Sequence, residues 1–126
     1  MITIPVSIGE LIDKLSILHI KQDKITNQKK LEYIKKEFEL LYNFSSVFLN
    51  DEKISNLYHQ LVNTNLELWE VEDKLRILES EKSFGPEFIQ LARDVYYTND
   101  KRFEIKNKIN EITFSEIKEV KEYIKY

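Results

Sequence analysis

The sequence contains no cysteine, only two glycines (Gly9 and Gly85) and only two prolines. The lack of cysteine excludes a disulfide framework, a thiolate zinc site and a cysteine nucleophile. The chain also has no glycine-rich phosphate-binding loop, no H-E-x-x-H zinc motif and no serine-centred nucleophile elbow. No apolar run approaches the ~20 residues that a membrane-spanning helix needs. We therefore expect no resident metal ion, no cofactor and no membrane segment.

An excess of positive charge is also missing, since 19 basic residues face 22 acidic residues and give a net charge of −3. Nucleic-acid binding needs a basic footprint, so we expect no nucleic-acid partner. Residues 1–7 carry neither the basic nor the apolar region of a signal peptide, which favours a cytoplasmic protein. The two histidines, His19 and His59, have no companion residues at metal-ligand spacing.

The sequence does contain apolar residues at helical spacing along most of its length. Ser7 and Glu10 form an S-x-x-E capping box that predicts the first helix start. Gly85 can end the third helix, and Pro86 suits the first turn of the fourth. We predict an extended N-terminal strap over residues 1–6 and helices over about 8–25, 28–49, 52–82, 86–112 and 116–125.

The short breaks between these helices favour antiparallel neighbours. The predicted fold is a single all-α domain, an antiparallel bundle of four main helices plus a short C-terminal helix. It is built on the long hairpin of residues 52–82 and 86–112, and the last helix caps the open end of the bundle.

A turn near Phe84 and Gly85 pairs hairpin residues whose numbers sum to about 170. In this register Val71 faces Asn99 and Leu68 faces Arg102. Glu72 and Asp73 of the third helix then lie at the level of Asn99 and Arg102 of the fourth. The predicted polar layer contains Trp69, Glu72, Asp73, Tyr96, Asn99 and Arg102, with Asn65, Arg76 and Arg93 as weaker members. A buried arginine needs a partner, and the simplest pairing joins Arg102 to Glu72 or Asp73, with Asn99 closing the network.

Two interpretations of this layer remain open. It can fix the register and orientation of the helices, as polar core residues do in coiled coils. It can instead line a cleft that binds a small polar or anionic ligand, or a side chain of a protein partner.

Five segments carry a resemblance to a known family: Ser7–Leu15 (SIGELIDKL), Leu68–Asp73 (LWEVED), Phe88–Tyr96 (FIQLARDVY), Asn99–Arg102 (NDKR) and Ile105–Asn110 (IKNKIN). They resemble an uncharacterised all-helical family, a domain of unknown function of bacteria and of phages of marine bacteria. The resemblance covers nearly the whole chain and supplies no catalytic residues. It implies a helical fold and a bacterial or phage source.

The first functional hypothesis is a non-catalytic interaction or accessory module that binds a protein partner or self-associates as a homodimer. The apolar face of the second helix is widened by Leu40 and Val47, which indicates contact with more than one neighbour.

The second hypothesis is a small all-helical enzyme or ligand binder at the polar layer. A magnesium-dependent nucleotide pyrophosphatase would use Glu67, Glu70 and Asp73 but lacks a second acidic pair at matching spacing. A mutase-like site would grip a dianion with Arg76, Arg93 and Arg102, the only arginines. Because neither motif is complete, an enzyme is the less favoured hypothesis.

Overall fold

The computed structural model describes residues 1–126 and contains four α-helices and no strand. The prediction of an all-α fold with four main helices is confirmed. The helices are α1 (Ile8–Lys24), α2 (Gln28–Leu49), α3 (Glu52–Ser80) and α4 (Pro86–Ile112). None of them combines the length and the apolar character required to cross a membrane.

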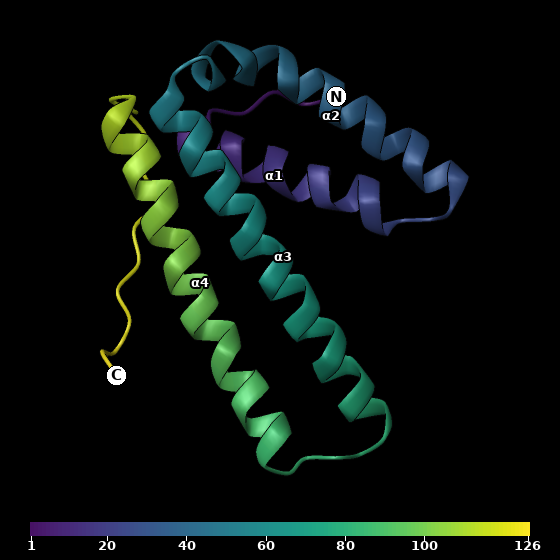
Figure 1. The fold of residues 1–126 in the computed structure, drawn as a ribbon. Coiled ribbons are helices and arrows are strands. Elements are labelled where there is room, and N and C mark those ends of the chain that lie inside the picture. Colours follow the sequence, from purple (N-terminus) through teal and green to yellow (C-terminus); the bar gives the residue numbers. More distant parts are fainter.

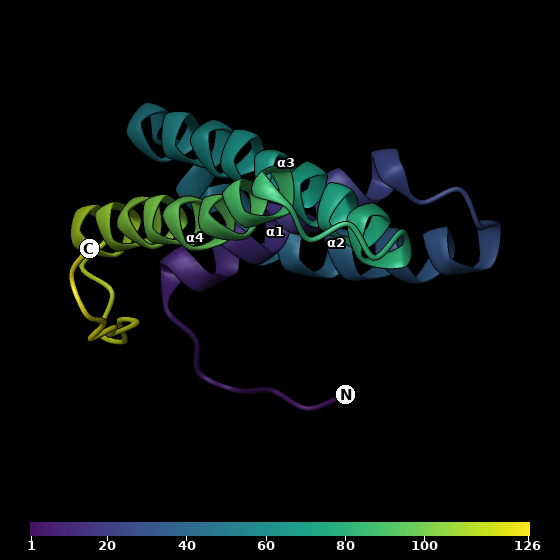
Figure 2. The ribbon, with the colours of Figure 1, turned by 90° about the horizontal axis from the view of Figure 1, so that it is seen from below.

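The four helices form two hairpins that diverge from a common junction (Figure 1). The α1–α2 hairpin packs near the end of the molecule where α3 begins and α4 ends. From there the outer half of the α3–α4 hairpin projects away from α1 and α2 (Figure 1). In a view turned by 90°, the N-terminal and C-terminal segments lie on the same side of the helices (Figure 2). The molecule is therefore V-shaped, with its buried contacts at the apex.

Polar side chains mark where three of the helices begin. Ser7, Asn27 and Asp51 each accept a hydrogen bond from a backbone N–H of the first turn that follows. Such caps satisfy N–H groups that have no partner within the helix. Gly85 precedes Pro86 at the start of α4 and makes no side-chain cap.

The end of α3 departs from the prediction, because Lys82 and not Gly85 adopts the left-handed conformation. Lys82 has a φ of 56°, and the N–H of Ser83 bonds to the carbonyl of Leu78 at 2.9 Å. Phe114 repeats this arrangement after α4, with a φ of 52° and a 2.9 Å bond from Ser115 N–H to Asn110 O. This i to i−5 bond is the Schellman pattern, which a lysine and a phenylalanine here complete without glycine.

The hydrophobic core sits at the apex and draws on α1, α3 and α4. Its members are buried aliphatic residues whose spacing places them on one face of each helix: Ile12, Ile54, Leu57, Leu61, Ile105 and Ile109. Beyond Val71 in α3, and before Thr98 in α4, no residue is buried. The outer half of the hairpin is thus held by its own two helices alone.

The predicted fifth helix is wrong, because residues 116–126 form no helix. The hydroxyl of Ser115, expected to cap that helix, instead accepts from the N–H of Ile8 and donates to the carbonyl of Ile117. Val120 and Ile124 are largely exposed, so no surface covers the apolar face of the predicted helix. A segment this short needs such packing to hold a helix in water.

The N-terminal residues 1–6 also form no regular structure. Ile2 and Ile4, which the prediction placed in a strap across the bundle, are 88% and 67% exposed. The segment therefore does not bury its apolar side chains against the helices.

Candidate functional site

A buried ion pair joins α1 to α4 close to the apex. The carboxylate of Asp13 accepts two hydrogen bonds from Nε of Arg102, at 3.0 and 3.2 Å, and one from Nη2 at 2.5 Å. The Asp13 side chain is 1% exposed, whereas that of Arg102 is 25% exposed. The hydrogen bonds to Asp13 raise the pKa of Arg102, although burial acts in the opposite direction. The guanidinium therefore stays charged and compensates the charge of the buried carboxylate.

α3 completes the surroundings of Asp13. The side-chain amide of Asn65 donates to Asp13 Oδ1 and to Ser16 Oγ, both at 2.9 Å. Ser16 in turn donates to the backbone carbonyl of Asp13 at 2.6 Å. Asp13, Ser16 and Asn65 are all buried, and the hydrogen-bond donors to the carboxylate come from α3 and α4.

One turn further along α4, Lys106 forms a second buried charge centre. Its Nζ lies 2.8 Å from Glu10 Oε2 of α1 and 2.6 Å from Glu119 Oε2 of the C-terminal segment. Burial lowers the pKa of Lys106, but hydrogen bonds to Glu10 and Glu119 outweigh that effect and leave the pKa raised. Glu10 was expected to close the capping box with Ser7, and its carboxylate pairs with Lys106 instead.

The next turn of α4 contacts the start of α1. The side-chain oxygen of Asn110 accepts a 2.7 Å hydrogen bond from the N–H of Gly9. A Cβ at residue 9 would lie 2.5 Å from the carbonyl oxygen of Lys106 and 2.9 Å from Asn110 Oδ1. Only glycine allows α1 and α4 to approach this closely. We call the set Gly9, Glu10, Asp13, Ser16, Asn65, Arg102, Lys106 and Asn110 the apex cluster.

Two buried polar atoms near this cluster lack a hydrogen-bond partner. They are the hydroxyl oxygen of Thr64 in α3 and the side-chain nitrogen of Asn110. Both residues are nearly inaccessible to solvent. An unsatisfied buried group costs about 1–3 kcal/mol, so the cluster is not fully optimised for stability.

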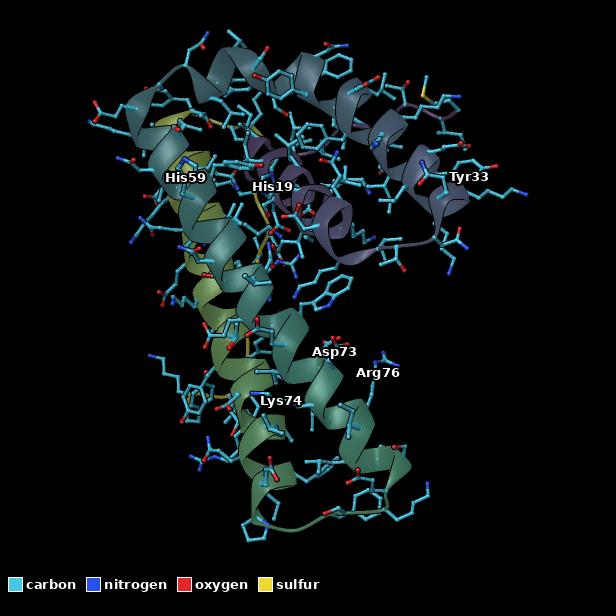
Figure 3. The ribbon with its side chains drawn as sticks, turned by 45° about the vertical axis from the view of Figure 1, so that its right-hand side comes forward. His19, Tyr33, His59, Asp73, Lys74 and Arg76 are labelled. Atoms are coloured by element: carbon cyan, nitrogen blue, oxygen red, sulfur yellow. The ribbon has the colours of Figure 1, made fainter.

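Only two members of the predicted polar layer, Arg102 and the weaker candidate Asn65, belong to the apex cluster. The predicted pairing of Arg102 with Glu72 or Asp73 is wrong, because Arg102 pairs with Asp13 and both alternatives are exposed. Asp73 projects from α3 on the side away from α4 (Figure 3), and Arg76 is exposed.

The remaining predicted residues do not gather around a common point of contact. Trp69 and Asn99 are partly buried, whereas Tyr96 and Arg93 are exposed. Tyr96 packs against the rings of Tyr97 and Tyr126, with centroids 5.1 and 5.0 Å away. A register of α3 and α4 alone leaves out α1, whose Asp13 supplies the missing charge.

The sequence reasoning missed Asp13, Ser16, Lys106 and Asn110. A signal for the α4 residues was present, because Arg102, Lys106 and Asn110 follow one another at intervals of four and so share one helix face. Asp13 lies between Ile12 and Leu15 on the buried side of α1, where an unpaired carboxylate would be costly. These two observations together demand a basic partner for Asp13 on a neighbouring helix.

The surface carries two shallow hollows near the predicted layer. One, of about 450 Å³, lies between α4 and the C-terminal segment and includes Tyr96, Asn99 and Lys121 in its lining. The other, of about 420 Å³, lies on the outer half of the α3–α4 hairpin beside Glu72 and Arg76. No group of three or more acidic or histidine side chains lies close enough to hold a metal ion.

The chemistry of the apex cluster is that of charge compensation. Arg102 and Lys106 each face carboxylates, so neither presents an uncompensated positive charge to an anion. No nucleophile–base pair is part of the cluster. Its contacts join Gly9 to Asn110, Glu10 to Lys106 and Asp13 to Arg102, in antiparallel order along α1 and α4.

The model of a protein family matches residues 2–125 of the chain, a range that includes both partners of each of these contacts. The chain belongs to the family of unknown function DUF6165. Comparisons with curated proteins and with solved structures find no match for the chain. Membership in DUF6165 agrees with the all-helical resemblance noted in the sequence. It assigns neither a reaction nor a ligand to the apex cluster.

Proposed function

We propose that this member of DUF6165 is a non-catalytic helical interaction module that binds a protein surface through α2. The observation that carries the proposal is that α2, with 22 residues, buries only Ser45. A helix so weakly covered by its own domain offers its apolar side chains to a partner. A cytoplasmic location and a bacterial or phage source are further parts of this proposal, and self-association as a homodimer is one form that the interaction can take.

α2 presents two apolar stripes. The stripe that faces α1 contains partly buried residues such as Phe38, Leu41 and Phe48. A second stripe lies about 110° further around the helix axis, at ~100° per residue. Its members are exposed and follow one another at intervals of seven, four and three residues: Tyr33, Leu40, Phe44 and Val47.

The second stripe has the geometry of a helix-packing face. Phe44 is 63% exposed and Val47 is 67% exposed, although both are large and apolar. Intervals of three and four residues are those by which one helix presents side chains to another. This supports a helical partner surface, in addition to α1 and α3, the two helices of the chain that α2 contacts.

Site-specific photocrosslinking in living cells tests the proposal. We expect p-benzoylphenylalanine at position 44 to form adducts of defined mass with a polypeptide. The matched control places the same residue at Glu39, which is also exposed but lies about 140° around the same helix. The adduct must then be reproduced from purified components; absence of any adduct at position 44, or equal adducts at position 39, would contradict the proposal.

A second candidate function, binding of a small polar or anionic molecule, is favoured by the hollow between α4 and the C-terminal segment. Lys121 and Asp100 place both charges in its lining, Lys121 also lies 3.8 Å from Glu119, and Tyr96 supplies an aromatic face. Isothermal titration with magnesium and a panel of nucleotides tests it, including its pyrophosphatase form. A heat of binding that is seen with the wild-type chain and is lost in Lys121→Ala would support this function. The absence of any heat of binding with the wild-type chain would contradict it.

A further inference from the structure

The outer end of the α1–α2 hairpin is positively charged. Residues 20–36, which we call the basic arm, contain six lysines and only two acidic residues, a net charge of +4. Five of the lysines are exposed. Tyr33, 71% exposed, lies at this end of the hairpin (Figure 3). The basic arm therefore combines positive charge with an apolar contact residue.

The outer part of the α3–α4 hairpin carries the opposite charge. Residues 66–97, which we call the acidic arm, contain eight acidic and four basic residues, a net charge of −4. Large apolar side chains are exposed along it, including Ile77, Phe84 and Ile89 at 50–56%. This arm also combines charge with apolar surface that nothing in the chain covers.

The V shape keeps the two arms of one chain apart. The apex core holds α1 against α3 and α4, and the outer ends of the two hairpins diverge from it (Figure 1). In a two-fold dimer, the basic arm of each copy can meet the acidic arm of the other. Two identical contacts then form and the assembly closes on itself.

Charge decides between this arrangement and its alternatives. Contact of basic arm with basic arm, or of acidic arm with acidic arm, places like charges together and is disfavoured. Reciprocal contact pairs +4 with −4 twice. It also covers the exposed apolar residues of both arms.

We propose that the partner of this protein is a second copy of the same chain, bound by reciprocal contact between the basic arm and the acidic arm. The inference rests on the proposed interaction function and identifies its partner. Tyr33 and the neighbouring part of the second α2 stripe would pack on the outer α3–α4 hairpin of the other copy. Because the contact is partly electrostatic, its affinity falls as salt screens the two arms.

Sedimentation equilibrium with the purified full chain tests the inference. We expect a species of twice the 15.2 kDa chain mass, with dissociation favoured on going from about 0.05 M to about 1 M salt. Lys35→Glu/Lys36→Glu on the basic arm and Glu79→Lys/Glu81→Lys on the acidic arm should each weaken the dimer by roughly tenfold or more. The matched control, Lys53→Glu/Lys108→Glu, reverses two exposed lysines near the apex and should leave it unchanged.

Mixing the two arm variants gives the sharpest outcome. The first variant has a neutral basic arm and an unchanged acidic arm of −4, and the second has an unchanged basic arm of +4 and a neutral acidic arm. A mixed dimer regains one contact of +4 with −4, which neither variant can form with itself. The mixture should therefore form a heterodimer more readily than either variant self-associates. A monomer at all concentrations, or a dimer insensitive to both arm variants, would overturn the inference. If the chain is monomeric while position 44 still crosslinks to another polypeptide, the second-copy inference fails and the interaction function stands.

Discussion

Asp13 and Arg102 are 89 positions apart in the chain and form a bidentate ion pair whose acidic member is buried and whose basic member reaches solvent. This asymmetry sets the cost of removing either side chain. Arg102→Met leaves a buried carboxylate without a counter-charge and should lower the free energy of unfolding by about 3–5 kcal/mol. Asp13→Asn leaves a guanidinium that water can reach, and the loss should be roughly 1–3 kcal/mol.

The double variant Asp13→Asn/Arg102→Met completes the thermodynamic cycle. It removes both charges, so it should be more stable than Arg102→Met alone, as measured by urea denaturation. Additive losses would contradict the direct pairing. If Arg102→Met instead kept full stability and changed a cellular phenotype, the ion pair would have a functional role and not a structural one.

Gly9→Ala tests the close approach of α1 and α4. Its Cβ would meet the backbone carbonyl of Lys106 at 2.5 Å, so the helices must separate, at a cost of about 1–3 kcal/mol. Gly85→Ala is the matched control, because no atom lies within 4 Å of its Cβ and its φ is −79°. The control should change the free energy of unfolding by less than about 1 kcal/mol; equal losses in both variants would argue against the steric explanation.

Lys106 predicts a pH dependence on the alkaline side. Its pKa is raised in the folded protein above the ordinary value of 10.5, so its contribution to stability is fully present below pH 10.5. That contribution is lost as the pH rises through the folded pKa. The free energy of unfolding should therefore fall more steeply above pH 10.5 in the wild type than in Lys106→Met, measured by chemical denaturation from pH 8 upward in the two proteins side by side. Parallel slopes would contradict the prediction.

The exposed stripe of α2 should contribute little to the stability of the single chain. Phe44→Glu/Val47→Glu should change the free energy of unfolding by less than about 1 kcal/mol at concentrations where the chain is monomeric. The same variant should bind less of a hydrophobic dye than the wild type. Leu61→Ala is the contrasting control, because Leu61 is fully buried and its truncation should cost about 2–5 kcal/mol. A large loss of stability in the α2 variant would show that the stripe packs within its own chain.

The helices were predicted well because the features that start a helix and set its buried face lie close together in the sequence. Ser7, Asn27 and Asp51 cap the helices that they precede, and apolar spacing follows from helix geometry alone. The C-terminal segment shows the limit of this reasoning. Ile117, Val120 and Ile124 have helical spacing, but a short helix needs a surface to cover, and the hydroxyl of Ser115 is already engaged by α1.

The candidate site was predicted only in part for a different reason. The polar character of Arg102 and Asn65 was evident, yet their partner Asp13 lies on a helix whose placement the hairpin register does not determine. A pairwise register of α3 and α4 contains no information on how α1 crosses them. Charge balance across all helices, beginning from the buried position of Asp13, would have been the better guide.

The start of α1 has a consequence for the order in which the chain becomes structured during synthesis. The N–H groups of Ile8 and Gly9 find their acceptors on Ser115 and Asn110, which are 107 and 101 positions later in the chain. A nascent chain that has not yet extended to these residues leaves the first turn of α1 hydrogen-bonded to water. The start of α1 can therefore form its native hydrogen bonds only after all four helices have been synthesised, and the apex closes after that point.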